Sequence, residues 1–357
     1  MSRLLFPDQG ECVNLHAAKQ RLKFTNNFIC KLGAMSKLLP STQCIKSYLL
    51  INGPLITIGC LFHLSLLCAG EDSSDMKSVA LETITFGGKN FILLFGIDYM
   101  TRSRMDIIER VIVSSSDSSV VSGVSLDSHS SWKSVISSVL AFTFLETMTY
   151  NTALWLGLIQ LSSLRTFSSS VMGGVSCFSC YGSFIITSFI VEVIFDFFHY
   201  WSHRLLHLQP VLYRSLHSLH HHNSNPTVYH TFNDSICGTI LTNPIPHLLA
   251  LFLLSAILRR PITHIEHSLL LVYKTFVEVS GHSGKELGKA SSFPQCKWLP
   301  TLVGIELYTF DHHSHHRNAK TNFSKRFVLW DKVFGTYLSP QKSVKFVEIN
   351  QKVLPTK

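Results

Sequence analysis

Charged residues are scarce in this sequence, and their scarcity excludes several classes of protein. Asp, Glu, Lys and Arg make up 15% of the 357 residues, against about 25% in an average soluble domain. The Gly-Pro repeats of collagen, the heptads of a coiled coil and the low hydrophobicity of a disordered chain are also missing. Apolar residues reach 46%, the mean hydropathy is +0.24, and the apolar residues occur in blocks. The composition therefore indicates a membrane protein.

Three common motifs are also missing. The nine cysteines follow no framework spacing, so we expect reduced thiols. Cys177 and Cys180 form a C-x-x-C within an apolar run, where two small hydrophobic residues on one helix are the expected structure. Without a glycine-rich dinucleotide fingerprint, electrons for any redox reaction must come from a separate protein. A zinc hydrolase of the H-E-x-x-H type is disfavoured because no Glu lies beside the paired histidines.

The apolar blocks predict an all-α integral membrane protein, a helical bundle of about four spans or hairpins. The first block, residues 47–69, is 23 residues without a charge, long enough to cross a hydrocarbon core of about 30 Å at about 1.5 Å per residue. Further blocks are expected at residues 132–164, 171–198, 236–258 and 262–279. Residues 71–131 are polar and predict a loop with one interfacial helix.

Four regions follow from these blocks. They are a basic N-terminal cytosolic arm (1–46), an N-terminal membrane region with a Ser-rich loop at about 101–131 (47–170), a catalytic domain (171–340) and a C-terminal tail (341–357). The net charge of +9 lies largely in the two terminal stretches. Cytosolic flanks of membrane spans next to anionic lipid explain that distribution better than nucleic-acid binding.

Histidines are strongly clustered. Sixteen of the 19 fall between His199 and His316, and they form three ordered groups. The groups are His203-x-x-x-His207 with His199 one turn earlier, His217-x-x-His220-His221, and His312-x-x-His315-His316. Residues three or four apart lie on one face of a helix, so each group can aim at least two imidazoles at one point. Eight imidazoles can hold two metal ions, and ligands of this kind suit iron or zinc.

The remaining histidines and the nearby acids have different expected roles. Lone histidines are expected to be hydrogen-bonded structural residues, namely His16, His63, His129 and His247. For four others, a ligand role and a bystander role are both open: His199, His222, His230 and His313. Carboxylates are expected to orient the ring N–H groups of the ligands, and the candidates are Asp196, Asp234, Glu278 and Asp311.

The order of these motifs resembles the fatty acid hydroxylase/sterol desaturase superfamily over about residues 175–338. The resemblance rests on Asp196-Phe-Phe-His-Tyr-Trp-Ser-His203-Arg-Leu-Leu-His207, on the second histidine group, and on His312-x-x-His315-His316 followed by Asn322-Phe-Ser and Trp330-Asp331. Ser280-Gly-His282-Ser-Gly284 resembles the His-Ser-Gly segment of the methylsterol oxidase branch, so His282 is an added candidate ligand. Two departures are Phe323-Ser324 in place of Tyr-Gly, and Asn233-Asp234-Ser235 where many sterol-acting members have His-Pro.

The resemblance implies an endoplasmic-reticulum membrane enzyme with two non-haem iron ions. Such an enzyme hydroxylates or desaturates a sterol, sphingolipid or fatty-acyl lipid with O2 and with electrons from NAD(P)H through cytochrome b5 or a reductase. The catalytic metal ligands are then expected to be His203, His207, His217, His220, His221, His312, His315 and His316, with His282 as a ninth metal ligand. The histidine cluster and both basic termini are expected in the cytosol. A catalytically silent membrane scaffold and a histidine-rich metal transporter are the alternatives.

One topological requirement follows. The three histidine groups can meet only if the chain between the second and third crosses the bilayer an even number of times. Residues 236–258 and 262–279, separated by a turn at Pro261, satisfy this as two spans or as a re-entrant hairpin. Arg259 and Arg260 at the tip disfavour a fully exposed loop on the non-cytosolic side, and the sequence does not decide between the two.

Overall fold

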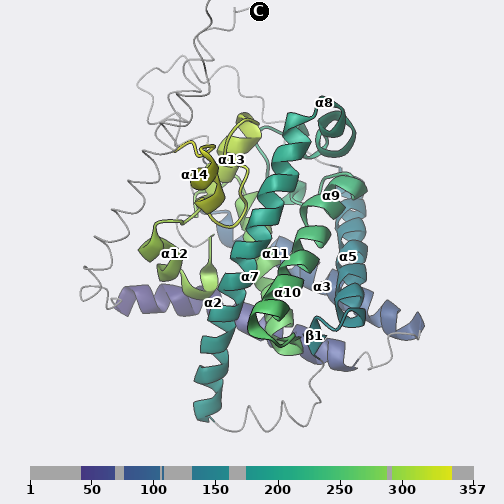
Figure 1. Ribbon diagram of the computed structural model, residues 1–357, viewed down its shortest axis with the longest axis vertical. Coiled ribbons are helices and arrows are strands. Elements are labelled where there is room, and N and C mark those ends of the chain that lie inside the picture. Colours follow the sequence, from purple (N-terminus) through teal and green to yellow (C-terminus); the bar gives the residue numbers. More distant parts are fainter. Residues whose placement is uncertain are drawn as a thin grey trace, which may run out of the picture.

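The computed structural model describes residues 42–68, 76–104, 107, 131–160, 174–287 and 292–339. This part of the chain is a bundle of helices with one parallel pair of two-residue strands, β1 and β2 (Figure 1). The α-helices are α2 Thr42–Cys68, α3 Met76–Thr101, α5 Trp132–Trp155, α7 Gly174–Leu208, α8 Pro210–Leu212, α9 Ile236–Thr242, α10 Pro244–Leu258, α11 His264–Gly281, α12 Trp298–Val303, α13 Thr309–Arg317 and α14 Leu329–Phe334. The other elements are β1 Ile159–Gln160, β2 Ile262–Thr263, the π-helix η3 Tyr213–His217, and the 3₁₀ helices η4 His220–His222, η5 Val228–His230 and η7 Pro294–Cys296.

Within the described residues, four helical segments are long and apolar enough to cross a membrane: Tyr48–Cys68, Lys77–Thr101, Tyr181–Leu208 and Ile236–Leu258. They confirm the predicted multi-pass helical membrane fold. The expected loop over residues 71–131 is wrong for α3, which is continuous from Met76 to Thr101. The basic arm up to residue 41, most of the serine-rich segment and the tail from residue 340 lie outside the described residues.

The polar residues of α3 made this segment look like a loop in the sequence. The structure shows why a membrane helix can contain them. Lys89 Nζ lies 2.6 Å from Glu146 Oε1 on α5, and Glu82 accepts a hydrogen bond of 2.8 Å from Asn151. Asn90 also donates to Glu146. Buried polar groups are tolerated when they are paired, and Glu82 and Lys89 of α3 find their partners on α5.

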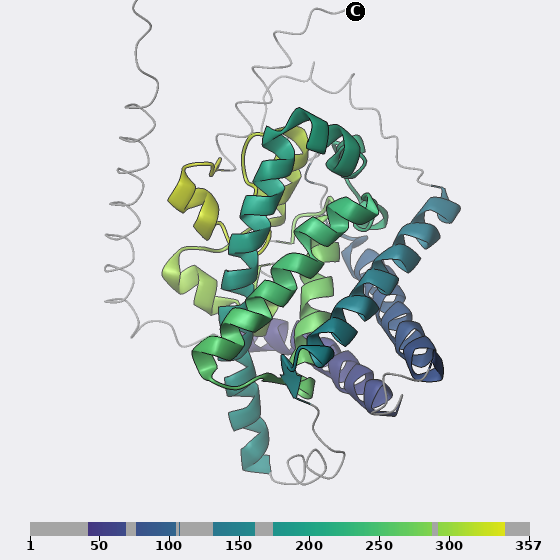
Figure 2. The same ribbon diagram turned by 45° about the vertical axis from the view of Figure 1, so that its right-hand side comes forward.

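Helix α7 joins the apolar layer to the histidine end of the molecule. Its 35 residues extend about 52 Å at 1.5 Å per residue, more than the roughly 30 Å of a hydrocarbon core. Its sequence changes accordingly from an apolar first half to a last part carrying His199, His203 and His207. In Figures 1 and 2 the short elements α8 and α13 gather beside this end of α7.

Helices α9, α10 and α11 form the expected return path. The chain leaves the histidine end through α9 and α10, which meet at Asn243-Pro244, where proline occupies the first position of the new helix and needs no hydrogen-bonded N–H. After β2, α11 runs back (Figure 2). Thr263 and Glu266 form a capping box that begins it, satisfying the free N–H groups of its first turn.

Helix α11 is the centre of the bundle. Nearly all of its residues between His264 and Ser280 are buried, which explains a sequence too polar to face lipid. Its approach to α2 is close: a Cβ on Gly59 would lie 2.5 Å from Leu269 Cδ2. The polar residues of α11 are therefore buried inside the protein. His282 follows directly after the last residue of this helix.

Candidate metal centre

Nine histidines converge in two groups at one end of the bundle. The first group contains five imidazoles and the second four, and within each group the potential ligand nitrogens all lie within 4.8 Å of one another. The first group is His203, His207, His217, His221 and His315; the second is His220, His282, His312 and His316. These are the nine residues expected to bind metal from the sequence, and the structure brings all of them together.

Local helical geometry supplies most of these positions. On α7, His203 and His207 are four residues apart, and their Nε2 atoms lie 3.2 Å from each other. On α13, His312 and His316 repeat this spacing with the same separation of 3.2 Å. His217 ends the π-helix η3; such wide turns occur often at functional sites because they re-aim a side chain.

Each H-x-x-H-H motif contributes to both groups. In the motif at residues 217–221, His217 and His221 enter the first group and His220 enters the second. In the motif at residues 312–316 the division is reversed, because His315 enters the first group while His312 and His316 enter the second. Consecutive helical residues point about 100° apart, so an adjacent pair can reach two neighbouring centres.

Backbone carbonyl groups fix the orientation of the rings in the first group. His203 Nδ1 lies 2.8 Å from the carbonyl oxygen of Phe323, and His315 Nδ1 lies 2.7 Å from that of Thr321. A carbonyl oxygen only accepts hydrogen bonds, so both Nδ1 atoms carry the proton. The Nε2 atoms of these two rings are therefore unprotonated, and they lie 3.1 Å apart.

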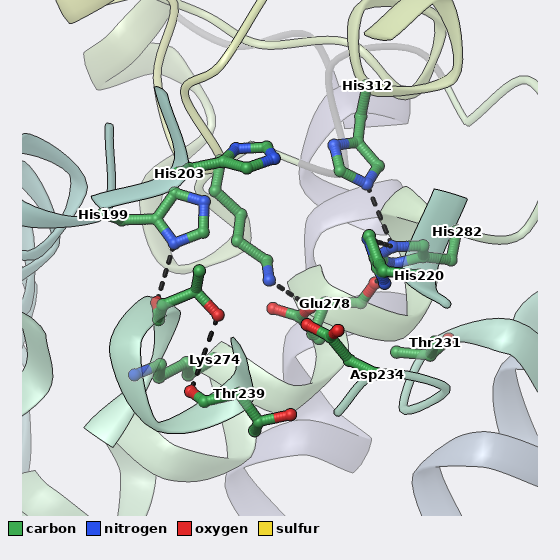
Figure 3. Close-up of polar contacts among 12 residues, drawn as sticks. His199, His203, His220, Thr231, Asp234, Thr239, Lys274, Glu278, His282 and His312 are labelled. Carbon is green, nitrogen blue, oxygen red and sulfur yellow. Dashed lines mark hydrogen bonds and ion pairs between the residues drawn. The ribbon is translucent and has the colours of Figure 1, made fainter. Parts of the chain in front are cut away.

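The second group is arranged around His282. His282 Nδ1 lies 2.9 Å from the carbonyl oxygen of Glu278, one turn earlier on α11, which leaves its Nε2 unprotonated. This Nε2 lies 3.0 Å from His312 Nε2 and 3.3 Å from His220 Nε2. Lys325 forms an ion pair with the side chain of Glu278. Figure 3 shows Glu278 close to His220 and His282 of this group.

The donor set fits metal ions well. A metal bonded to imidazole at about 2.0–2.1 Å would place neighbouring ligand nitrogens about 3.0 Å apart in an octahedral arrangement and about 3.4 Å apart in a tetrahedral one. The closest nitrogen–nitrogen distances within the two groups are 3.0–3.3 Å. Moreover, both ring nitrogens of His217 and of His221 are buried without a hydrogen-bond partner. A cation would satisfy these lone pairs.

Electrostatics keep the rings neutral, as ligands must be. Burial and the neighbouring rings lower the pKa of His312 and of His316 well below the usual range. Burial also lowers the pKa of His315 to about 3. Desolvation penalises a charged imidazole, and several charged rings so close together would repel one another.

Most of the carboxylates that were expected to orient the histidine rings instead accept backbone N–H groups or form ion pairs. Asp196 accepts three backbone N–H groups from residues 325–327, and Asp311 accepts the N–H of Tyr308. The Glu278 side chain pairs with Lys325 and Arg326, and its backbone oxygen holds His282. Of the four candidates, only Asp234 directs its carboxylate towards a ring of the two groups, with Oδ2 at 3.6 Å from His217 Nδ1. Their expected common role is therefore wrong for the other three.

The Asn322-Phe-Ser segment keeps its turn despite its unusual residues. Asn322 takes the left-handed conformation with φ 58°, and the N–H groups of Phe323 and Ser324 each donate to the Asp331 carboxylate at 2.9 Å. Neither Phe323 nor Ser324 has a positive φ, so no glycine is required here. The bend presents the Phe323 carbonyl oxygen to His203.

The four undecided histidines lie outside both groups. His199 Nδ1 lies 2.7 Å from the carbonyl oxygen of Thr242, and His230 closes the capping box of η5 with Thr227. His313 is buried on the other side of α13, and neither it nor His222 joins a group. The expectation of structural roles holds for His63, bonded to His264 at 2.7 Å, and for His247, 3.1 Å from His267; His16 and His129 lie outside the described residues.

The geometry thus describes a helical membrane protein in which two adjacent, largely buried groups of histidines could each hold a metal ion. Residues 188–336 match the family model described as fatty acid hydroxylase. This match confirms the resemblance to that family seen in the histidine motifs.

Three curated relatives carry the names of lipid hydroxylases or monooxygenases. The fatty acid hydroxylase vlmA of Lecanicillium sp is 34% identical over 157 residues, covering 41% of this chain and 40% of its own. The methylsterol monooxygenase erg25A of Aspergillus fumigatus is 32% identical over 168 residues (45% and 49%). The sphingolipid C4-hydroxylase SUR2 of Saccharomyces cerevisiae is 29% identical over 162 residues (44% and 41%). The chain therefore spans less than half the length of these relatives. No solved structure matches it.

Proposed function

We propose that this protein is a membrane-bound lipid oxygenase with a non-haem di-iron centre, which uses O2 to hydroxylate or desaturate a lipid. The observation that carries the proposal is the pair of adjacent histidine groups at the end of a membrane bundle. The hydroxylase and monooxygenase names of the relatives support it. Iron bound to these groups would supply the activation of O2 and the cleavage of an unactivated C–H bond, which acid–base side chains alone cannot achieve.

The contribution of the chain's own residues follows from the geometry. The nine histidines hold the metals, and the carbonyl groups of Phe323, Thr321 and Glu278 keep three of the rings in the tautomer that leaves Nε2 free. Burial of the rings limits access of bulk water, and a donor set of neutral imidazoles would leave the positive charge of bound metal ions uncompensated. The Asp234 carboxylate, with Oδ2 3.6 Å from His217 Nδ1, would balance part of that charge.

The cellular arrangement is part of the same proposal. The protein lies in the endoplasmic-reticulum membrane, with the histidine end and both basic termini facing the cytosol. Electrons reach the site from NAD(P)H through cytochrome b5 or a reductase. The substrate is a sterol, a sphingolipid or a fatty-acyl lipid, and it enters from the bilayer.

The decisive experiment measures metal and oxygen together. Protein purified in detergent should contain about two iron ions per chain, and it should consume O2 in the presence of lipid extract, NADH, cytochrome b5 and its reductase. Lipid extracts from cells with and without the gene should differ by a hydroxylated or desaturated product. Iron without O2 consumption would indicate a silent scaffold, and metal-dependent ion flux in vesicles would indicate a transporter; either result would overturn the proposal.

A further inference from the structure

A cavity lies between α5, the α9–α10 pair and α11, on the membrane side of the histidine groups. Its walls are partly apolar, with Phe142, Leu145 and Leu271 among them. Phe142, Thr239, Asn243 and Glu278 line this cavity and also a second hollow whose walls include His203, His217, His220 and His312. The two hollows therefore adjoin and share these four residues as a common wall.

One side chain in the wall of this cavity is unusual. Lys274 of α11 lines the cavity, and among the described residues no carboxylate lies within ion-pair distance of it. Its Nζ lies 3.8 Å from the centre of the Phe195 ring instead. An aromatic face compensates an ammonium group only in part, so this lysine can accept a further partner. Figure 3 shows Lys274 beside Thr239, outside the ring of histidines.

The charges around Lys274 do not balance. Glu192 pairs with Arg326 at 2.9 Å, and Glu278 pairs with Lys325 and Arg326. Glu146, also in the cavity wall, pairs with Lys89. Glu192 and Glu278 therefore face the three basic side chains of Lys325, Arg326 and Lys274, and Lys274 carries the excess positive charge when its amine is protonated. A buried charge is costly without a partner, and a ligand with one negative charge would provide it.

We propose that this cavity binds the anionic end group of an acyl lipid, a carboxylate or a phosphate monoester, with Lys274 as its partner. This inference rests on the proposed function and names the substrate class for the same site. A lipid with a cationic amine would place two positive charges together and is disfavoured. A neutral ester would leave Lys274 as unpaired as before.

The same helix relates the end group to the metal centre. Lys274, Glu278 and His282 follow one another at intervals of four residues on one face of α11, so Lys274 lies about 12 Å from His282 along the helix axis. A lipid held by its charged end at Lys274 would reach the histidine groups with a carbon further along its chain. The Lys274 position thereby selects which carbon is exposed to oxidation.

Binding of simple lipids to the purified full chain tests this directly. We would measure the affinities of stearic acid, octadecyl phosphate, methyl stearate and octadecylamine by displacement of a fluorescent acyl probe. The wild-type protein should bind at least one of the two anions about tenfold or more tightly than the ester and the amine, because a charge-assisted bond is gained. Whichever anion binds more tightly identifies the natural end group.

Substitutions give the necessary controls. Lys274→Met should abolish the preference for the anion, Lys274→Arg should retain it, and Lys133→Met, at an exposed lysine of α5, should leave it unchanged. Iron content is measured on every sample. Equal binding of acid and ester by the wild type, or an undiminished preference in Lys274→Met, would overturn the inference even if iron is present. Absence of iron would instead overturn the proposed function and leave the binding result standing.

Discussion

The Nε2 atoms of His203 and His315 lie 3.1 Å apart, although each ring already donates its Nδ1–H to a backbone carbonyl group. Two unprotonated nitrogens cannot form a hydrogen bond with each other. At this distance their lone pairs repel, unless a cation lies between them. A cation bound between the two nitrogens would therefore stabilise this arrangement.

Removing one of these rings should remove metal. His315→Ala deletes one of five nitrogens in the first group, and we expect that group to lose its iron while the protein still inserts into membranes. Iron per chain, measured by mass spectrometry on purified protein, checks this. His313→Ala is the matched control, because His313 is also buried on α13 but joins neither group. Full iron content in His315→Ala would remove that residue from the site.

The Asp331 carboxylate should be indispensable for the turn that supports His203. It accepts the N–H groups of Phe323 and Ser324 and the hydroxyl of Thr336. In Asp331→Asn an amide NH₂ group, which cannot accept a hydrogen bond, would replace one of the two carboxylate oxygens and face one of these donors. We therefore expect the free energy of unfolding to fall by about 2 kcal/mol or more. Thermal unfolding in detergent measures this, together with iron retention.

A substitution in the same turn serves as its control. Ser324→Gly restores the glycine found in related proteins, and it leaves the backbone N–H bonded to Asp331. We expect near wild-type iron content for this variant. A larger loss for Ser324→Gly than for Asp331→Asn would show that the turn depends on the serine side chain instead.

Gly238 should be essential for placing His217. A Cβ at this position would lie 2.1 Å from the carbonyl oxygen of Leu216, the residue before His217, so Gly238→Ala must displace η3 or α9. We expect reduced iron content with little change in membrane insertion. Gly182→Ala, on α7 with nothing within 4 Å of its added Cβ, should behave like the wild type. Equal iron in both variants would contradict the proposed coupling.

The buried Lys89–Glu146 pair should matter more when it is broken than when it is replaced. Lys89→Met leaves the Glu146 carboxylate without its cation inside the bundle, and such losses cost about 3–5 kcal/mol. The double variant Lys89→Met/Glu146→Gln carries no buried charge here and should recover much of that loss. Thermal unfolding of the single and double variants in detergent measures the difference. A double variant less stable than Lys89→Met would disprove this account.

The histidine site was largely predictable because its information is local. Spacings of three and four residues on helices determine which imidazoles share a face, so eight of the nine histidines could be chosen from their spacing. His282 was chosen from the resemblance of Ser280–Gly284 to a known segment. Their division between two groups was not predictable, because it depends on how η4 and α13 are rotated against each other in the fold. The carbonyl groups that hold His203, His282 and His315 were missed for a similar reason: every residue has a carbonyl, so position alone distinguishes them.

The membrane region was predicted less completely. Long uncharged blocks such as residues 47–69 could be recognised, but Lys89 and Asn90 made α3 look like a loop. Their partners lie more than fifty residues away on α5, and no local pattern records such a pairing. Glu278 was recognised as important, but its side chain binds Lys325 and Arg326 rather than a histidine ring.

The division of adjacent histidines between the two groups has a consequence for the binding of metal ions. His220 and His221 share one short turn, and so do His315 and His316, so neither centre can be formed or dismantled without moving residues of the other. A metal ion bound to the first group of histidines would hold the backbone of these turns in the conformation that the second group needs to bind its own ion. The two ions should therefore enter cooperatively, and a protein carrying a single ion should be rare at any iron concentration.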